Sequence, residues 1–314
     1  MMSTPKANIA LFFLLACLWS GSFVGIKVVV ATWPPVFGAA VRVAIALISI
    51  MILLLAMHKK TFVQFSLRWK FWVIGVFSQA IPFTFLFWGE RFVSPGLAGI
   101  LNGTVPIWTF AFALLFMPKL ADFSVLKTLG LLTGLSGITI VFWPLLTFEY
   151  SLNMISGAAA ILVMAMSYAI GGLLNQRLFK SDIKVDFFTN LYHQHWGSLI
   201  FLVLVSGVFE KWPSIQYLVL DYTPWLACLY LGVFATALAY AIFYHLIREW
   251  DAVRATSVLY VVPVLALVWD YVFFNNPPHS TEIIGVAAIL SGVVLIQLSA
   301  IRREYIRQQV QTGD

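Results

Sequence analysis

The sequence predicts an all-α integral membrane protein with ten transmembrane helices arranged as two inverted five-helix repeats. The chain of 314 residues is 61% hydrophobic and only 10% charged, whereas soluble proteins carry about 25% charged residues. The charged residues fall in short clusters between apolar runs, and landmarks of the first half of the chain return in the second. The net charge of +6 belongs to these clusters, so it does not indicate nucleic-acid binding.

Apolar runs of roughly 20 residues are long enough to cross the bilayer core as helices. We expect such spans at approximately 8–30, 35–57, 70–89, 95–117, 125–143, 154–176, 187–209, 224–247, 253–274 and 281–301. The span at 187–209 is the least apolar, because it contains Asn190, His193, Gln194 and His195. The first run is longer than a signal-peptide core and no small-residue cleavage site follows it, which predicts a retained helix.

An internal repeat divides the chain into halves, residues 1–147 and 148–314. The landmarks of the first half return 157 residues later, and then 155 residues later after a two-residue gap. The matched pairs are Gly75 and Gly232, Arg91 and Arg248, Ala98 and Ala255, Pro106 and Pro263, Gly130 and Gly285, and Gly137 and Gly292. Repeated halves in a very apolar chain are typical of secondary transporters.

The distribution of basic residues predicts how the spans are oriented. With both termini in the cytoplasm, fifteen of the 19 Lys and Arg residues lie on the inner side, and only Arg91 and Lys211 lie in outer loops. The remaining two, Lys27 and Arg42, lie inside spans. Because each half contains five spans, an odd number, the two halves must be inserted upside down relative to each other.

Four segments carry a resemblance to a known family. Residues 18–27 read LWSGSFVGIK, the second span carries Pro35, Arg42 and Ala46, and residues 231–240 and 255–263 resemble the eighth and ninth spans of the same family. Over nearly its whole length the chain resembles the drug/metabolite transporter superfamily, EamA-like family. It departs at residues 116–119 and 274–277, where the family often carries a Gly-Glu pair.

The resemblance implies a transporter of small organic metabolites in the cell inner membrane, frequently an exporter of amino acids or related compounds. It also implies a cavity between the halves, with spans three, four, eight and nine forming much of its wall. Inverted halves are the usual basis of alternating access. We therefore expect a small-molecule substrate and the lipid bilayer as partners, with no nucleic acid; the oligomeric state stays open.

Two other functions were weighed against transport. A membrane-embedded enzyme is disfavoured because the chain has no H-E-x-x-H or G-x-S-x-G motif and no paired intramembrane carboxylates. A non-transporting scaffold or channel is disfavoured because the polar residues cluster at mid-depth rather than along a pore. Cys17 and Cys228 lie within apolar runs, so we expect no disulfide, metal or cofactor.

Polar and ionisable side chains inside spans are expensive to insert and are candidates for function. The substrate-binding candidates are Gln79, Asn102, Trp108, Tyr168, Tyr240 and Tyr260. The candidates for a hinge or gate are Pro82, Pro106, Pro263 and Arg42, since a proline inside a helix removes a hydrogen bond. The alternatives are helix-to-helix hydrogen bonding for the amides, core packing for the aromatics and simple kinks for the prolines.

Asp270 and His193 are the candidates for ion or proton coupling. Asp270 is expected either to pair with Arg42 or Lys27, to carry a proton, or simply to lie at the interface. Lys27 is expected to snorkel to the outer headgroups, and Glu90 to lie in a solvated turn. His193 and His195 point to different faces of a helix, which argues against a shared metal site.

Overall fold

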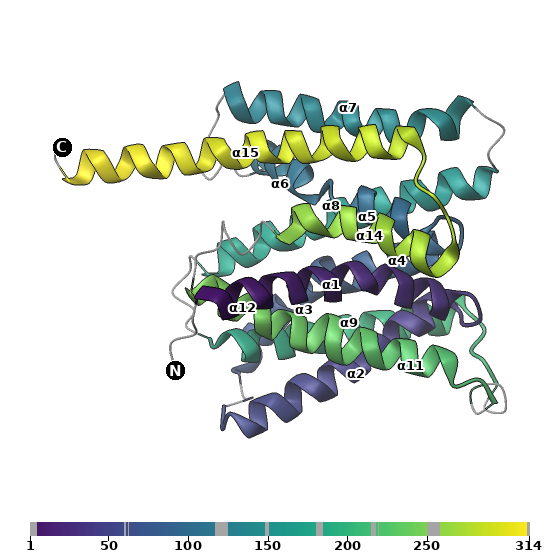
Figure 1. The fold of residues 1–314 in the computed structure, drawn as a ribbon. Helices are drawn as coiled ribbons and strands as arrows, with labels where there is room; N and C mark the ends of the chain where they lie inside the picture. The colour runs from purple at the N-terminus through teal and green to yellow at the C-terminus, as the bar shows by residue number, and fades with distance from the viewer. Residues whose placement is uncertain are drawn as a thin grey trace.

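The computed structural model describes residues 5–59, 61, 63–116, 125–147, 151–179, 185–214, 218, 220–249 and 258–312, and this part of the chain is helical without a strand (Figure 1). The first half contains α1 (Pro5–Val30), α2 (Pro35–Ala56), α3 (Phe65–Gly75), η1 (Val76–Ala80), α4 (Ile81–Glu90), α5 (Pro95–Asn102), α6 (Val105–Phe116) and α7 (Val125–Thr147). The second half contains α8 (Leu152–Phe179), α9 (Phe187–Phe209), α11 (Thr223–Leu229), η2 (Tyr230–Leu238), α12 (Ala239–Glu249), α14 (Val258–Phe274) and α15 (Ser280–Thr312).

Within the described residues, six helical stretches are long and apolar enough, by length and composition, to cross a membrane. They are Lys6–Val30, Pro35–Ala56, Leu67–Glu90, Pro95–Phe116, Leu152–Leu178 and Thr223–Phe243. Shorter apolar stretches are Thr128–Val141, Val261–Phe274 and Ser280–Leu295. Helix α9 belongs to neither set, in line with the polar residues that dilute it. Residues 253–257 of the predicted ninth span, including Ala255 of the repeat, lie outside the described residues.

Two of these stretches contain a π-helical segment. η1 continues directly from α3 into α4, and η2 continues from α11 into α12. Adding the repeat interval of 157 to residues 76–80 gives 233–237, which fall inside η2. A π-helical turn is wider than an α-helical one and occurs frequently at functional sites. Both π-helical segments therefore occupy matching positions of the sequence repeat.

Serine side chains of neighbouring helices reach carbonyl groups around η1. The Ser198 hydroxyl in α9 donates to the carbonyl oxygen of Gly75 at 2.8 Å, and the Ser167 hydroxyl in α8 donates to that of Phe77 at 2.8 Å. In η2 the Thr236 hydroxyl donates to the carbonyl oxygen of Leu231, five residues earlier, at 2.7 Å. Since lipid offers no hydrogen-bonding partner, these contacts make an irregular backbone tolerable inside a bilayer.

Helices α7 and α15 lie side by side along one edge of the bundle (top of Figure 1). Glycines allow their backbones to approach closely: Gly137 packs against Gly285, and Gly130 packs against Gly292. The two contacts show that the helices are antiparallel. Because the repeat matches Gly130 with Gly285 and Gly137 with Gly292, it converts each of the two contacts into the other. α1 begins and α15 ends at the same end of the bundle (left in Figure 1).

Gly134, Gly137 and Gly171 each pack closely against a neighbouring helix. A Cβ atom on Gly171 would lie 2.6 Å from the Cα atom of Ser78 in η1. Gly172, in contrast, has no atom of another described helix within 4 Å of its Cβ position. Gly172 faces outward on α8, so it does not serve a helix contact.

Gly292→Ala tests the α7–α15 interface, with Gly172→Ala as the matched control. A Cβ atom on Gly292 would lie 2.5 Å from the carbonyl oxygen of Gly130, which is backbone and cannot rotate away. We expect Gly292→Ala to lower the free energy of unfolding by about 1–3 kcal/mol. Gly172→Ala should cause no loss, since alanine favours helix. Thermal unfolding of the purified protein in detergent measures both, and an equal effect of the two substitutions would contradict the interface.

Candidate functional site

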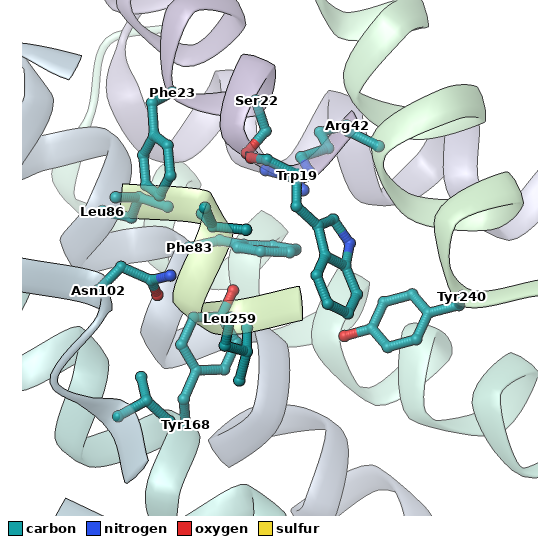
Figure 2. Close-up of a pocket in the computed structure, with 13 residues that line it drawn as sticks. Trp19, Ser22, Phe23, Arg42, Phe83, Leu86, Asn102, Tyr168, Tyr240 and Leu259 are labelled. Atoms are coloured by element: carbon teal, nitrogen blue, oxygen red, sulfur yellow. The ribbon is translucent and has the colours of Figure 1, made fainter. Parts of the chain in front are cut away.

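A cavity of about 230 Å³ lies among the helices of both halves (Figure 2). Its walls come from α1, α2, α4, α5, α6, α8, η2, α12 and α14. Aromatic and aliphatic side chains dominate the lining, with polar groups at a few positions. The lining residues are Trp19, Ser22, Phe23, Arg42, Phe83, Leu86, Asn102, Val105, Tyr168, Ala235, Tyr240, Leu259 and Val262. An apolar cavity with few polar groups is the usual form of a small-molecule site.

Arg42 is the charged residue of the cavity wall. It is only 5% exposed, and its Nε atom donates to the hydroxyl oxygen of Thr236 at 3.2 Å. Its guanidinium carbon lies 4.2 Å from the centre of the Phe83 ring, a cation–π contact. The Nη1 atom of Arg42 is buried and has no hydrogen-bond partner. At least one donor nitrogen of the guanidinium is therefore left unsatisfied by the protein.

Aromatic rings form the apolar part of the cavity wall. Trp19 of α1 meets Tyr240 of α12 edge to face, with ring centres 6.2 Å apart. Tyr168 of α8 meets Phe83 of α4 in the same manner at 6.5 Å. Figure 2 shows these rings around the cavity, with the Asn102 amide entering from another helix. Rings from both halves thus enclose the space beside the Arg42 guanidinium.

Of the predicted substrate-binding residues, the structure brings Asn102, Tyr168 and Tyr240 together at the cavity, with Arg42 from the predicted gate. Gln79 and Trp108 lie outside the lining. Gln79 is 1% exposed and accepts a hydrogen bond from Ser198 at 3.3 Å, whereas the Trp108 indole donates to the Thr104 hydroxyl at 3.1 Å. The side chain of Tyr260 lies outside the described residues, although its backbone belongs to α14.

The predicted hinge prolines occupy different backbone settings. Pro82 and Pro106 lie in the first turns of α4 and α6, and α6 begins after a break at Gly103 and Thr104. A proline at the start of a new helix, as at α6, removes no helical hydrogen bond, because the first N–H groups of a helix have no acceptor within that helix. Pro82 nevertheless lies inside the continuous helical stretch Leu67–Glu90. Pro263 lies inside α14, and its ring packs against Gly103. The repeat-related proline regions therefore meet each other beside the cavity.

The coupling candidates lie away from the cavity lining. His193 has its Nε2 atom 2.9 Å from the carbonyl oxygen of Thr61, and its ring stacks on Phe71. The Asp270 carboxylate accepts hydrogen bonds from the Gly96 amide at 3.0 Å and from the Asn276 side chain at 3.2 Å. These contacts hold His193 on α9 and tie the end of α14 to the start of α5.

One expectation for a charged residue, Glu90, is wrong, and one of the three alternatives for Asp270 is not observed. Asp270 forms no ion pair with Arg42 or Lys27; the ion pair among the described residues joins Lys59 to Asp186. The Lys27 ammonium donates to the carbonyl oxygens of Glu90 and Val93 at 2.6 and 2.8 Å, and its expected position at the outer headgroups stays a prediction. Glu90 is not in a solvated turn but fully buried.

Reasoning from sequence missed most of the apolar lining, such as Phe83, Leu86 and Val262. No local signal distinguishes an apolar side chain facing a cavity from one facing lipid. For Glu90 a signal did exist, because its repeat partner is Ile247. An acid at a position where the other half carries an apolar residue suggests burial.

Asn102→Cys and Gln79→Cys distinguish the cavity wall from the surrounding core. In a Cys17→Ser background, which leaves only the buried Cys228, a small water-soluble methanethiosulfonate should modify Asn102→Cys several-fold faster than Gln79→Cys. Asn102 faces the cavity, whereas Gln79 is enclosed. Mass spectrometry of the intact protein follows the modification. Equal rates at the two positions would contradict the assignment of the wall.

Comparison with known proteins agrees with this architecture. The sequence profile of the EamA-like transporter family matches residues 7–143 and, separately, residues 155–298. The chain is 24% identical over 288 residues to the uncharacterized transporter YoaV of Bacillus subtilis (strain 168), covering 91% of this chain and 95% of that one. It is 26% identical over 291 residues to the uncharacterized inner membrane transporter YedA of Escherichia coli (strain K12), covering 91% and 89%. A structure titled "Crystal structure of protein" has the same fold, with a TM-score of 0.65 at 19% identity over 96% of this chain and 100% of that one. The resemblance predicted from the motifs is confirmed, and this multi-pass membrane protein belongs to the EamA-like transporter family.

Proposed function

We propose that this protein is a secondary transporter that moves a small organic carboxylate, such as an amino acid or a related metabolite, out of the cell by alternating access. The observation that carries the proposal is the Arg42 guanidinium, which lines a cavity between the halves with one donor nitrogen unpartnered. The names of the relatives YoaV and YedA favour transport over an enzyme or a scaffold. Export is the direction that the family resemblance suggests.

The buried guanidinium favours a negatively charged ligand. A charge at the centre of a membrane helix costs about 2.5–3.5 kcal/mol unless a partner satisfies it. Thr236 and the Phe83 ring satisfy part of the guanidinium, and a carboxylate matches the remaining donors in shape and charge. The cavity of about 230 Å³ lies below the range of roughly 300–1,000 Å³ that is usual for drug-sized ligands. A small metabolite with an apolar or aromatic body therefore suits the site.

Three features support inverted halves, and hence alternating access about this cavity. The family profile matches the chain twice, once in each half. The π-helical segments occupy repeat-related positions. The antiparallel α7–α15 pair uses repeat-related glycines in contacts that the repeat interchanges. With the termini placed in the cytoplasm by the charge bias, the α4–α5 turn lies on the outer side of the membrane.

Arg42→Gln tests the site by removing the charge while keeping a polar side chain of similar reach. Hydrogen bonds to charged groups contribute about 1.5–3 kcal/mol, so apparent affinity should fall about 10–100-fold. Counterflow in proteoliposomes measures this, with radiolabelled leucine, phenylalanine, 4-methylpentanoate and 3-phenylpropanoate as probes. Arg42→Lys should retain part of the exchange, because it keeps the charge but loses the planar fork.

Arg91→Gln is the matched control, since Arg91 is exposed in the α4–α5 turn. Vesicles without protein correct for passive permeation of the acids. Unchanged exchange in Arg42→Gln would refute the site, and no exchange of any probe by the wild-type protein would refute the proposed substrate class.

A further inference from the structure

One buried acid lies directly beyond the cavity. Leu86 lines the cavity, and Glu90 follows it on the same face of α4 one turn later. The Glu90 side chain is 0% exposed, and neither of its carboxylate oxygens has a hydrogen-bond partner. A buried ionised carboxylate without a hydrogen-bond donor is unfavourable. The Glu90 carboxylate therefore needs a partner that the described residues do not provide.

The charged groups that act on the Glu90 carboxyl come from three neighbouring helices: Lys27 of α1, Arg42 of α2 and Asp270 of α14. Two of them are already engaged with the backbone. The Lys27 ammonium lies at the carboxyl end of α4, and the Asp270 carboxylate lies at the amino end of α5. A cation at the carboxyl end of a helix and an anion at the amino end both interact favourably with the helix dipole. Together the two contacts hold the α4–α5 turn between α1 and α14. Glu90 is left in the middle without a hydrogen bond.

The charges of these four residues balance when the cavity is empty. Lys27 and Arg42 contribute two positive charges, and Glu90 and Asp270 contribute two negative charges. A carboxylate bound to Arg42 adds one negative charge, and in a region of low dielectric this makes the potential at Glu90 more negative. Proton binding at Glu90 restores neutrality. By linkage, the anion and the proton then raise each other's affinity.

The lining of the cavity also limits which carboxylates fit. Among the described residues of its lining, Arg42 is the charged one, and none is an acid that could receive an ammonium group. A zwitterionic amino acid would leave its own ammonium without a carboxylate, whereas an acid without an amino group leaves nothing unpaired.

We propose that Glu90 is the proton-binding site of this transporter, and that a monocarboxylate anion on Arg42 crosses the membrane together with one proton on Glu90. This inference rests on the proposed function. The loaded and the empty transporter then carry the same charge, so a high cytoplasmic concentration of the acid drives its export with the proton.

Infrared spectroscopy of the full chain in lipid nanodiscs tests the proton site without a ligand. The carbonyl stretch of a protonated carboxyl group should titrate with pH in the wild-type protein and be lost in Glu90→Gln. The matched control is Glu249→Gln on the exposed surface of α12, which should keep the band. Glu90→Asp, which retains a carboxyl group, should keep a titrating band at a shifted position. A band that survives in Glu90→Gln unchanged would overturn the proposal.

Calorimetry tests the linkage, with 3-phenylpropanoate as the anion and phenylalanine as the same skeleton with an ammonium group. Comparing buffers with different heats of ionisation counts the protons taken up. Wild-type protein should take up about one proton per bound anion, and Glu90→Gln should bind the anion without proton uptake. Phenylalanine should bind more weakly and without proton uptake.

The two experiments fail in distinguishable ways. If the wild-type protein binds neither compound, the proposed carboxylate substrate is wrong, while the infrared titration still decides whether Glu90 holds a proton. If the wild-type protein and Glu90→Gln take up the same number of protons on binding the anion, Glu90 is not the coupling site.

Discussion

An arginine inside the apolar core of the bundle is the constraint on which the rest of the site depends. Lipid offers no partner for the Arg42 guanidinium, so the protein or a ligand must satisfy it. The Nε atom of Arg42 donates to Thr236, whose own hydroxyl donates to Leu231 within the π-helical segment η2. The π-helical turn, the threonine and the arginine thus form one connected unit. The Nη1 atom of the guanidinium has no partner in the protein, and in the proposed site a carboxylate in the cavity satisfies it.

Equivalent helix contacts in the two halves carry different side chains and have different roles. Gly232 brings η2 against the Arg42 backbone of α2, and its repeat partner Gly75 brings the start of η1 against the Gln194 backbone of α9. Gln194 is satisfied by Ser78, Asn175 and Asn190 in a neutral network. At the equivalent contact in the other half, Arg42 keeps an unpartnered donor beside the cavity. The repeat therefore builds two similar helix crossings. Amide side chains satisfy one another at the first, and an arginine donor is left unpartnered at the second, where we propose that an anion binds.

The fold followed from sequence because its determinants are periodic and local. Apolar runs of the right length, broken by charged and turn-forming residues, predicted helices close to the observed bounds. The two π-helical segments were not predicted, although they fall at repeat-related positions. The residues of the site were harder to predict from the sequence. Asn102, Tyr168, Tyr240 and Arg42 are polar groups in apolar surroundings and could be found, but Gln79 satisfied the same criterion and lies outside the lining. Glu90 was misjudged because it lies near a span end, where only the tertiary contacts of α1, α4 and α5 decide between water and burial.

The central claim is that this cavity recognises a carboxylate through an otherwise unsatisfied arginine. The most direct measurement compares each of a series of small aliphatic and aromatic acids with its own primary amide, which has the same shape without the charge. Ligands that bind only the folded protein raise its thermal unfolding temperature. Recognition of the carboxylate predicts that at least one acid raises the unfolding temperature of the purified protein while its amide does not. An amide that stabilises the protein as strongly as its acid, in every pair that binds, would contradict it.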